Sequence, residues 1–300
     1  MARVQLTRVD DLTAEGEALA VRCGGPVGLA AVLGDLDRRL RRTVAPCLSR
    51  HRAWTWEAAD RRDPEWWPQG VSPAPEPGVL GVTWYAKGGG SRLSVLDLRS
   101  RRYRHVPLVR PTSDGYEPLR VHAGGLAWSG RRLYVAATRA GLWVCDTDDV
   151  VRVPDGYVLP ARHRIAADAG DGEPLRFSFV SVASSDPGRL VVGEYGNRRQ
   201  TRRLAHLSPD GGALELVDGG VVRAQGVVET DGSYAVSASH GPWTPGSLWT
   251  GRPVAFRERR WALPMGPEDL ALSADGRWLW TVTEHPRRRW IVRLPTPHGG

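Results

Sequence analysis

The chain is poor in several residue types on which many function classes depend. Its 300 residues include three cysteines, one lysine (Lys87) and one asparagine (Asn197). Cys23, Cys47 and Cys145 do not have the paired spacing of a zinc site, so we expect free thiols, with Cys23 and Cys47 pairing only in an exported protein. No apolar run approaches the roughly 20 residues of a membrane span, so we expect no membrane partner.

Several catalytic and targeting signatures are also missing from the sequence. The first eleven residues have no apolar segment of the signal-peptide type, so we expect a cytoplasmic protein. There is no Gly-x-Ser-x-Gly, His-x-His, His-Glu-x-x-His or Cys-x-x-Cys motif, which disfavours a serine hydrolase and gives no direct support to a metal site. Gly88-Gly89-Gly90 lies between two predicted strands and is not a phosphate loop, so no nucleotide or flavin is expected.

The positive charge comes almost entirely from arginine. The net charge is +8, and charge of this sign can indicate a nucleic-acid partner. The arginines are spread along the chain and do not alternate with aromatic residues as in known nucleic-acid modules. The arginine bias is typical of a GC-rich coding sequence, so we expect no nucleic-acid partner.

A short pattern recurs five times after residue 65. A turn with a polar residue is followed by a small or acidic residue and then by a hydrophobic strand. The openings are Trp-Pro-Gln-Gly-Val (67–71), His-Ala-Gly-Gly-Leu-Ala-Trp (122–128), Phe-Ser-Phe-Val-Ser (177–181), Ala-Gln-Gly-Val-Val (224–228) and Gly-Pro-Glu-Asp-Leu (266–270). Repeats of about 40–50 residues with several strands each are typical of a β-propeller.

The pattern predicts an all-β, five-bladed β-propeller over 66–300, with 1–65 as an N-terminal, helix-containing extension of the same domain. Apolar residues at helical spacing predict an amphipathic helix over about 28–44. The last repeat lacks an obvious fourth strand, and propellers often borrow one from the other end of the chain. Ala2–Thr7 or Ala53–Ala58 would supply it. Residues 155–175 are predicted to form a long loop, and several tryptophans are expected to fill the space between blades.

A propeller would bring the five openings together around one axis. The loops that lead into the first strands carry Gln69, His122, Ser178, Gln225, Glu268 and Asp269. The ends of the second strands carry Tyr85, Lys87, Thr138, Arg139, Glu194, Tyr195, His240, Glu284 and His285. This concentration of titratable side chains predicts a site at the mouth of the central channel.

The candidate residues allow several kinds of chemistry. His122, Glu194, Glu268 and His240 are candidate acid/base groups, and Lys87 would form a Schiff base or remain a solvated lysine. His122, Glu194, Glu268 and His285 would suit zinc or iron, whereas a carboxylate-rich subset would suit calcium. Candidate substrate-binding residues are Gln69, Tyr85, Tyr195, Gln225 and Asp269. For Gln69 and Gln225 the alternative is a structural role, tying loop backbones together.

On these residues the chain resembles an actinobacterial group of propeller-like proteins, many of them exported. The matching segments are Trp-Pro-Gln-Gly-Val (67–71), Tyr-Arg-His-Val (103–106), His-Ala-Gly-Gly (122–125), Val-Val-Gly-Glu-Tyr-Gly (191–196), Gln-Gly (225–226), Gly-Pro-Glu-Asp-Leu (266–270) and Thr-Glu-His-Pro (283–286). The group has no settled activity, so the resemblance implies architecture and not chemistry.

The Glu-Asp-Leu opening is also faintly similar to calcium-dependent lactonase propellers of the gluconolactonase and paraoxonase type. Those propellers use acidic and asparagine ligands, and Asn197 is the only asparagine here. We therefore expect an enzyme that acts on a small organic molecule by acid/base or metal-assisted lyase, cyclase, isomerase or hydrolase chemistry. The alternative is a non-catalytic propeller that binds a ligand or a protein.

Overall fold

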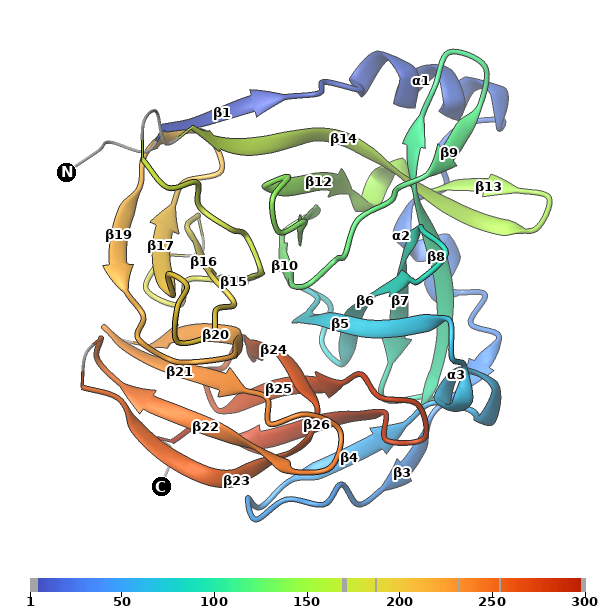
Figure 1. Ribbon diagram of the computed structural model, residues 1–300. Helices are drawn as coiled ribbons and strands as arrows, with labels where there is room; N and C mark the ends of the chain where they lie inside the picture. Colours follow the sequence, from blue (N-terminus) through green and yellow to red (C-terminus); the bar gives the residue numbers. More distant parts are fainter. Residues whose placement is uncertain (1–4, 169–171, 187, 231, 254, 298–300) are drawn as a thin grey trace.

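The computed structural model describes residues 5–168, 172–186, 188–230, 232–253 and 255–297. Strands dominate, and they are arranged as sheets around a central axis (Figure 1). The innermost strand of each sheet lies near the middle of the ring, as in a β-propeller. These strands are β5 (Trp66–Pro73), β10 (Leu126–Ser129), β15 (Phe179–Val182), β20 (Ala224–Thr230) and β24 (Pro267–Leu272).

Each innermost strand starts an antiparallel run of neighbouring strands. After β5 come β6 (Val79–Ala86), β7 (Ser91–Asp97) and β8 (Arg102–Pro111), and after β10 come β11 (Arg132–Ala136), β12 (Leu142–Asp146) and β14 (Gly156–Asp168). After β15 come β16 (Leu190–Gly193), β17 (Arg203–Leu207) and β19 (Glu215–Asp218); after β20 come β21 (Ser233–Ala238), β22 (Pro245–Gly251) and β23 (Arg257–Met265). After β24 come β25 (Trp278–Thr283) and β26 (Trp290–Pro295).

The fourth strand of the last sheet comes from the N-terminal part of the chain. Strand β4 (Arg52–Thr55) pairs antiparallel with β26, with Ile291 opposite Trp54. One of the two predicted closing segments, Ala53–Ala58, therefore takes this place. Strand β1 (Gln5–Val9) instead pairs with β14 and with β18 (Gly212–Ala213), and Ala2–Val4 of the other predicted segment lie outside the described residues.

Two predicted segments differ from the structure. The helix predicted over 28–44 is only α2 (Gly28–Leu33), and the arginine-rich part forms β2 (Arg38–Arg39) and β3 (Arg41–Thr43). The helix ends early because Leu29 and Val32 pack under β7 and β8, whereas Leu40 is buried with the tryptophans of the last sheet.

The loop predicted over 155–175 was also wrong in its first part, because 156–168 form the 13-residue strand β14. Gly156 and the nearby aspartates indicated a turn, but all residues from Tyr157 to Ala161 are buried, and His163 and Ile165 then alternate with more exposed residues as in a strand. β14 also pairs in parallel with β8, through Leu159 and Leu108, so the first two runs form one continuous sheet. The remaining elements are α1 (Thr13–Arg22), α3 (Ala58–Arg62), β9 (Tyr116–Pro118), β13 (Val151–Val153) and the 3₁₀ turn Thr147–Asp149.

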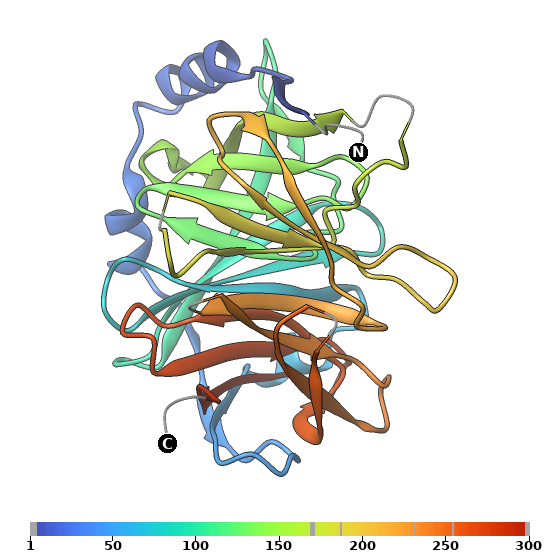
Figure 2. The same cartoon turned by 90° about the vertical axis from the view of Figure 1, so that its left-hand side faces the viewer.

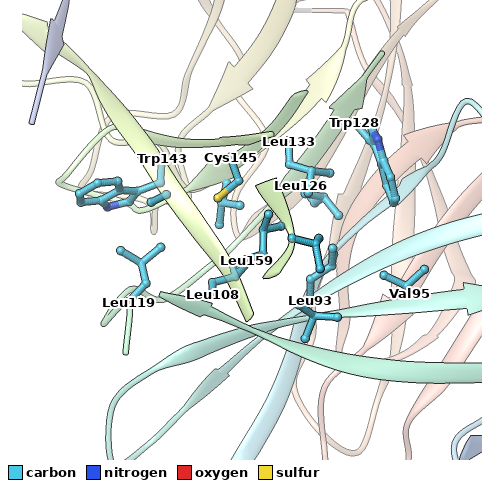
Figure 3. Packing of buried hydrophobic residues seen from close by; sticks show 14 of the residues in the cluster. Leu93, Val95, Leu108, Leu119, Leu126, Trp128, Leu133, Trp143, Cys145 and Leu159 are labelled. Atoms are coloured by element: carbon cyan, nitrogen blue, oxygen red, sulfur yellow. The ribbon is translucent and has the colours of Figure 1, made fainter. Parts of the chain in front are cut away.

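Apolar side chains fill the space between neighbouring sheets. Figure 3 shows Leu93, Leu108, Leu126 and Leu159 packed together between the first two runs. Between the last and first sheets the filling is aromatic. Trp56 meets Trp84 edge-on at 4.7 Å, and Trp54 lies 5.8 Å from Trp280. Of the tryptophans expected between blades, Trp84, Trp128, Trp143 and Trp280 are buried, and Trp249, Trp278 and Trp290 are half-buried.

A buried carboxylate attaches the N-terminal segment to the first sheet. Asp60 of α3 accepts a hydrogen bond from Tyr103 Oη, and its Oδ2 lies 3.0 Å from His105 Nε2. Arg92 Nη2 is 3.4 Å from Asp60 Oδ1, and these partners hold the pKa of Asp60 well below its usual value against the effect of burial.

Helices are short and peripheral. Figure 2 shows α1 on the outside of the sheets. No helix among the described residues is long and apolar enough to span a membrane. Cys23, Cys47 and Cys145 are free thiols.

Candidate functional site

The recurring openings correspond to irregular points in the innermost strands. The pairing register shifts between Pro68 and Val71 in β5, between Ala224 and Gly226 in β20, and between Pro267 and Leu270 in β24. A shift of this kind, as in a β-bulge, turns a side chain away from the regular alternation of the strand. The polar residues Gln69, Gln225 and Glu268 lie at these points.

Glycine in the openings allows neighbouring innermost strands to approach closely. A Cβ on Gly70 would lie 2.6 Å from Leu126 N, and a Cβ on Gly226 would lie 2.1 Å from Leu270 N. A Cβ on Gly125 would lie 2.5 Å from Val180 N. Equivalent residues of the repeats therefore lie side by side around the ring. The innermost strands run in the same direction along the axis.

Asp269 links innermost strands to one another next to these glycines. Its Oδ2 accepts the backbone N–H groups of Val71 (3.1 Å) and Leu126 (2.9 Å), and its Oδ1 accepts that of Leu270 (3.0 Å). The side chain is fully buried, and burial raises the pKa of Asp269 while the three N–H donors oppose the rise. The sequence suggested substrate binding for Asp269, but the structure places it as a tie between three innermost strands.

Next to this tie lies a pair of carboxyl groups. Glu268, which is 3% exposed, and Glu284, which follows β25, share a hydrogen bond between their side chains. Burial and the adjacent carboxylates raise the pKa of Glu268 well above its usual value, and burial also raises the pKa of Glu284. Both pKa values are shifted towards the protonated form, so the buried pair favours keeping a proton.

Two glutamines hold the carboxyl pair in place. Gln225 Nε2 donates to Glu268 Oε1 (3.1 Å), and Gln69 Nε2 donates to Glu284 Oε2 (3.0 Å) and to Pro68 O (3.0 Å). The network therefore runs from Gln225 through Glu268 and Glu284 to Gln69, across three of the five innermost strands and the end of β25. The structural role considered from the sequence was to tie loop backbones together. Both glutamines instead bond acidic side chains, and Gln69 also bonds the backbone of Pro68. We call these four residues the axial network.

Tyr85 and Arg289 border the axial network. Burial and the two glutamates raise the pKa of Tyr85 to about 12, so the phenol stays protonated at neutral pH. Arg289 is fully buried, donates through Nε to Glu284 O (2.8 Å), and through Nη1 to Asp60 O. Burial lowers the pKa of Arg289 to about 10, so it remains a cation next to the two carboxyl groups.

The exposed side of the site carries His122 and Lys87. The His122 ring lies 4.4 Å from the Tyr85 ring, and loss of water around it lowers the pKa of His122, which favours the neutral imidazole. Lys87 is exposed, and its Nζ lies 4.5 Å above the ring of Trp67. The positive charge of Lys87 also lowers the pKa of Glu284. Both residues would therefore meet a ligand before the buried glutamates do.

Glu194 was a candidate catalytic residue and metal ligand, but the structure gives it a different position. Arg203 binds its carboxylate through Nη2 (2.7 Å) and Nε (3.1 Å), and the backbone N–H groups of Arg176 and Arg203 donate to it at 3.0 Å each. These bonds lower the pKa of Glu194 and occupy its oxygens. The residue is an internal anchor of its sheet.

The other predicted residues are divided between the site and its surroundings. His285 Nε2 lies 3.4 Å from Glu284 Oε1, and burial lowers the pKa of His285. His240 instead bonds Ser247 Oγ (2.8 Å) on the β22 side of its sheet. Tyr195 is 41% exposed, and its carbonyl accepts a hydrogen bond from Arg176. Ser178 lies against Gly124 through its carbonyl oxygen.

The residues proposed as metal ligands do not form one centre. Among the described residues, no group of three or more His, Cys, Asp or Glu side chains is arranged to hold a metal ion. The oxygens of Glu194 are taken by Arg203 and backbone amides, and burial raises the pKa of Glu268, which disfavours the ionised form that a metal ion needs. The proposed set of His122, Glu194, Glu268 and His285 therefore does not fit a metal ion.

Two residues of the site were missed from the sequence. Arg289 and Trp67 are part of the surroundings of the carboxyl pair, with the Arg289 guanidinium carbon 5.8 Å from the Trp67 ring centre. Trp67 is adjacent to the first opening, and its place in the motif was a usable signal. Arg289 was one of many arginines, and the sequence alone does not distinguish a buried arginine from exposed ones.

The chain was compared with protein families, curated proteins and solved structures. No protein-family model and no curated protein matches the sequence. A gluconolactonase from Xanthomonas campestris is similar at 17% identity and a TM-score of 0.48, covering 88% of this chain and 86% of that one. A glutaminyl cyclase from Myxococcus xanthus is similar at 15% identity and a TM-score of 0.46, covering 87% and 98% of the two chains.

A chain in a crystal structure of a nidogen–laminin complex is also similar. It has 10% identity and a TM-score of 0.46, covering 82% of this chain and 86% of that one. The argument on function rests on the residues of the site.

Proposed function

We propose that the chain is an enzyme that transfers protons to and from a small polar organic molecule at the axial network. The observation that carries the proposal is the buried pair of Glu268 and Glu284, held by Gln225 and Gln69, in which burial raises the pKa of both carboxyl groups. A carboxyl group that stays protonated near neutral pH is an effective general acid, and the neighbouring carboxylate is the matching base. Strongly shifted carboxyl groups of this kind cluster at catalytic sites.

The surrounding residues suit proton transfer within a lyase, cyclase or isomerase reaction. Glu284 is the more accessible carboxyl, with 19% of its side chain exposed, so it would exchange the proton with the substrate. Glu268 would then return a proton to Glu284 through their shared bond. The phenol of Tyr85 would donate a hydrogen bond to a substrate oxygen, and Lys87 would attract an anionic group of the substrate.

The fold supports the same proposal at a larger scale. We propose that the five runs of strands are five blades and that 1–65 forms one domain with them. The three shifted pairings at β5, β20 and β24 then serve one purpose, because they direct Gln69, Gln225 and Glu268 towards a single point.

The experiment is a search for catalysed proton exchange in deuterated water. A panel of lactones, hydroxy acids and keto acids would be incubated with the protein, and loss of carbon-bound proton signals or product formation followed by NMR. The proposal expects activity on at least one compound, with Glu268→Gln and Glu284→Gln each about 10²–10⁴-fold slower, the range typical of a lost acid or base.

The matched control is Glu117→Gln, which neutralises an exposed glutamate in β9. It should retain the wild-type rate. Equal rates in Glu268→Gln and wild type would overturn the assignment of the proton donor. Failure of every panel compound to react or exchange would favour the non-catalytic alternative.

A further inference from the structure

A cavity lies at the other end of the innermost strands from the carboxyl pair. It has a volume of about 910 Å³, and its lining comes from the C-terminal ends of the innermost strands and the turns that follow them. The lining includes Ser72, Trp128, Ser181, Thr230 and Leu272, which lie on β5, β10, β15, β20 and β24. All five innermost strands therefore contribute to this cavity, which is in the size range of small-molecule sites.

Asp269 separates the cavity from the axial network. Its carboxylate binds the amides of Val71, Leu126 and Leu270, and the cavity-lining residues Ser72 and Ala271 come one position later in their strands. The corresponding position in β15 is Ser181. Small side chains at this position leave space around the axis that larger residues would fill.

The lining is rich in hydroxyl groups and poor in charge. Its hydroxyl residues are Ser72, Ser129, Ser181, Ser184, Thr230, Ser233, Ser273 and Thr296. Asp275 and Arg277, both exposed in the turn between β24 and β25, are the charged residues among the described lining. The apolar part consists mainly of alanine, proline and the edge of Trp128. Such a lining matches a neutral ligand with many hydroxyl groups.

Ser181 gives this match a specific anchor. Its residue is 2% exposed, and its Oγ is buried without a hydrogen-bond partner among the described residues. A buried hydroxyl without a hydrogen-bond partner is unfavourable, so a ligand that bonds to it removes this cost. By contrast, Ser72 Oγ already accepts Trp128 N (3.0 Å), and Ser184 Oγ donates to Glu229 O (2.6 Å).

We propose that this cavity binds a neutral polyhydroxylated compound of monosaccharide to disaccharide size, with Ser181 Oγ pairing with one of its hydroxyl groups. The site is independent of the acid/base chemistry at the opposite end of the axis. It gives the protein a second ligand-binding site on the same axis.

The test uses glucose, maltose and myo-inositol as neutral probes, and glucuronate and glucosamine as charged counterparts. Saturation-transfer NMR and calorimetry would measure binding to the whole protein. At least one neutral probe should bind, and more tightly than its charged counterparts. Ser181→Ala should weaken binding about 3–10-fold, the value of one neutral hydrogen bond, without lowering the melting temperature.

Three further variants locate the ligand. Ala274→Trp places a large ring in the exposed turn that lines the cavity and should abolish binding, whereas Ala14→Trp on the exposed face of α1 should not change it. Glu268→Gln, at the other end of the axis, should also leave binding unchanged. No binding of any neutral probe, tighter binding of the charged probes, or full binding in Ala274→Trp would overturn the proposal.

Discussion

Glu268 contributes to the way in which the stability of the protein responds to pH. Because its pKa is raised in the folded protein, the folded state keeps a proton that the unfolded chain loses above its ordinary pKa of about 4.3. The unfolded state then binds fewer protons, so the free energy of unfolding falls as pH rises through this window. Below about pH 4 both states are protonated and this contribution is fully present.

Glu268→Gln carries a neutral side chain at every pH and removes this dependence. We expect the variant to melt at the same temperature as wild type near pH 4 and several degrees higher near pH 8. Thermal unfolding of both proteins across this range would measure the difference. A difference in melting temperature between Glu268→Gln and wild type that stays constant with pH would contradict the raised pKa of Glu268.

Asp269 is predicted to be among the most sensitive residues for stability. Asp269→Ala would leave the buried N–H groups of Val71, Leu126 and Leu270 without their acceptor. Each unsatisfied donor costs about 1–3 kcal/mol, so we expect a loss of at least about 3 kcal/mol in the free energy of unfolding. Urea unfolding would measure this loss.

Asp269→Asn is the matched variant for this prediction. Its single carbonyl oxygen replaces Oδ2 and keeps two of the three bonds, while its amide group faces the N–H of Leu270. The free energy of unfolding of Asp269→Asn should therefore lie between those of Asp269→Ala and wild type. If Asp269→Ala were as stable as wild type, the carboxylate would not be a tie between strands.

At the scale of elements, the glycines of the openings set the distance between innermost strands. Gly226→Ala would bring a Cβ to 2.1 Å from Leu270 N, and the neighbouring backbone would have to shift. We expect a cost of about 1–3 kcal/mol, as for other overpacked interiors. Gly16→Ala is the control, since its Cβ meets nothing within 4 Å inside α1, and there alanine should stabilise the helix.

Circular dichroism melts of the two alanine variants would distinguish these effects. Gly226→Ala should also weaken the bond between Gln225 and Glu268, because both residues flank the contact. Equal melting temperatures for Gly226→Ala and Gly16→Ala would contradict the close approach of β20 and β24.

The sequence predicted the five innermost strands because each one follows or contains one of the recurring openings. The sequence did not predict β14, because the turn residues near Gly156 indicated a loop and the alternating burial begins only at Ala161. It also failed at 28–44, because apolar residues at helical spacing contact two different sheets and not one face of a helix.

The sequence also predicted that the openings meet, but it did not predict which side chains pair. Glu194 and Glu268 were equivalent candidates in the sequence. The structure shows that Arg203 forms an ion pair with Glu194, whereas Glu268 lies next to a second carboxyl group, that of Glu284. Such differences depend on neighbours far away in the sequence, such as Arg203 beside Glu194 and Gln69 beside Glu284. Periodicity contains no information about these distances.

At the scale of the whole molecule, the N-terminal part is predicted to be necessary for folding. Strand β4 pairs with β26, and Asp60 bonds Tyr103 of the first sheet, so the segment joins the two ends of the ring. A chain that starts at residue 64 would expose the edge of β26 and the ring of Trp280. We expect it to aggregate or to lose its cooperative thermal transition, as measured by calorimetry and light scattering.

Adding a synthetic peptide that covers 36–63 should restore part of the transition, since the peptide supplies β4 and Asp60. A truncated chain that melts as cooperatively as the full protein would show that 66–300 is a domain by itself. It would also contradict the proposed single domain.

The central claim is that Glu268 holds a proton which it shares with Glu284. Infrared spectroscopy of protein with carbon-13-labelled glutamate side chains, compared with the Glu268→Gln variant, tests it most directly. The account predicts a carboxylic-acid carbonyl band that persists at pH 7, is absent in Glu268→Gln, and shifts in Glu284→Gln. A spectrum in which every glutamate is ionised at pH 7 would contradict it.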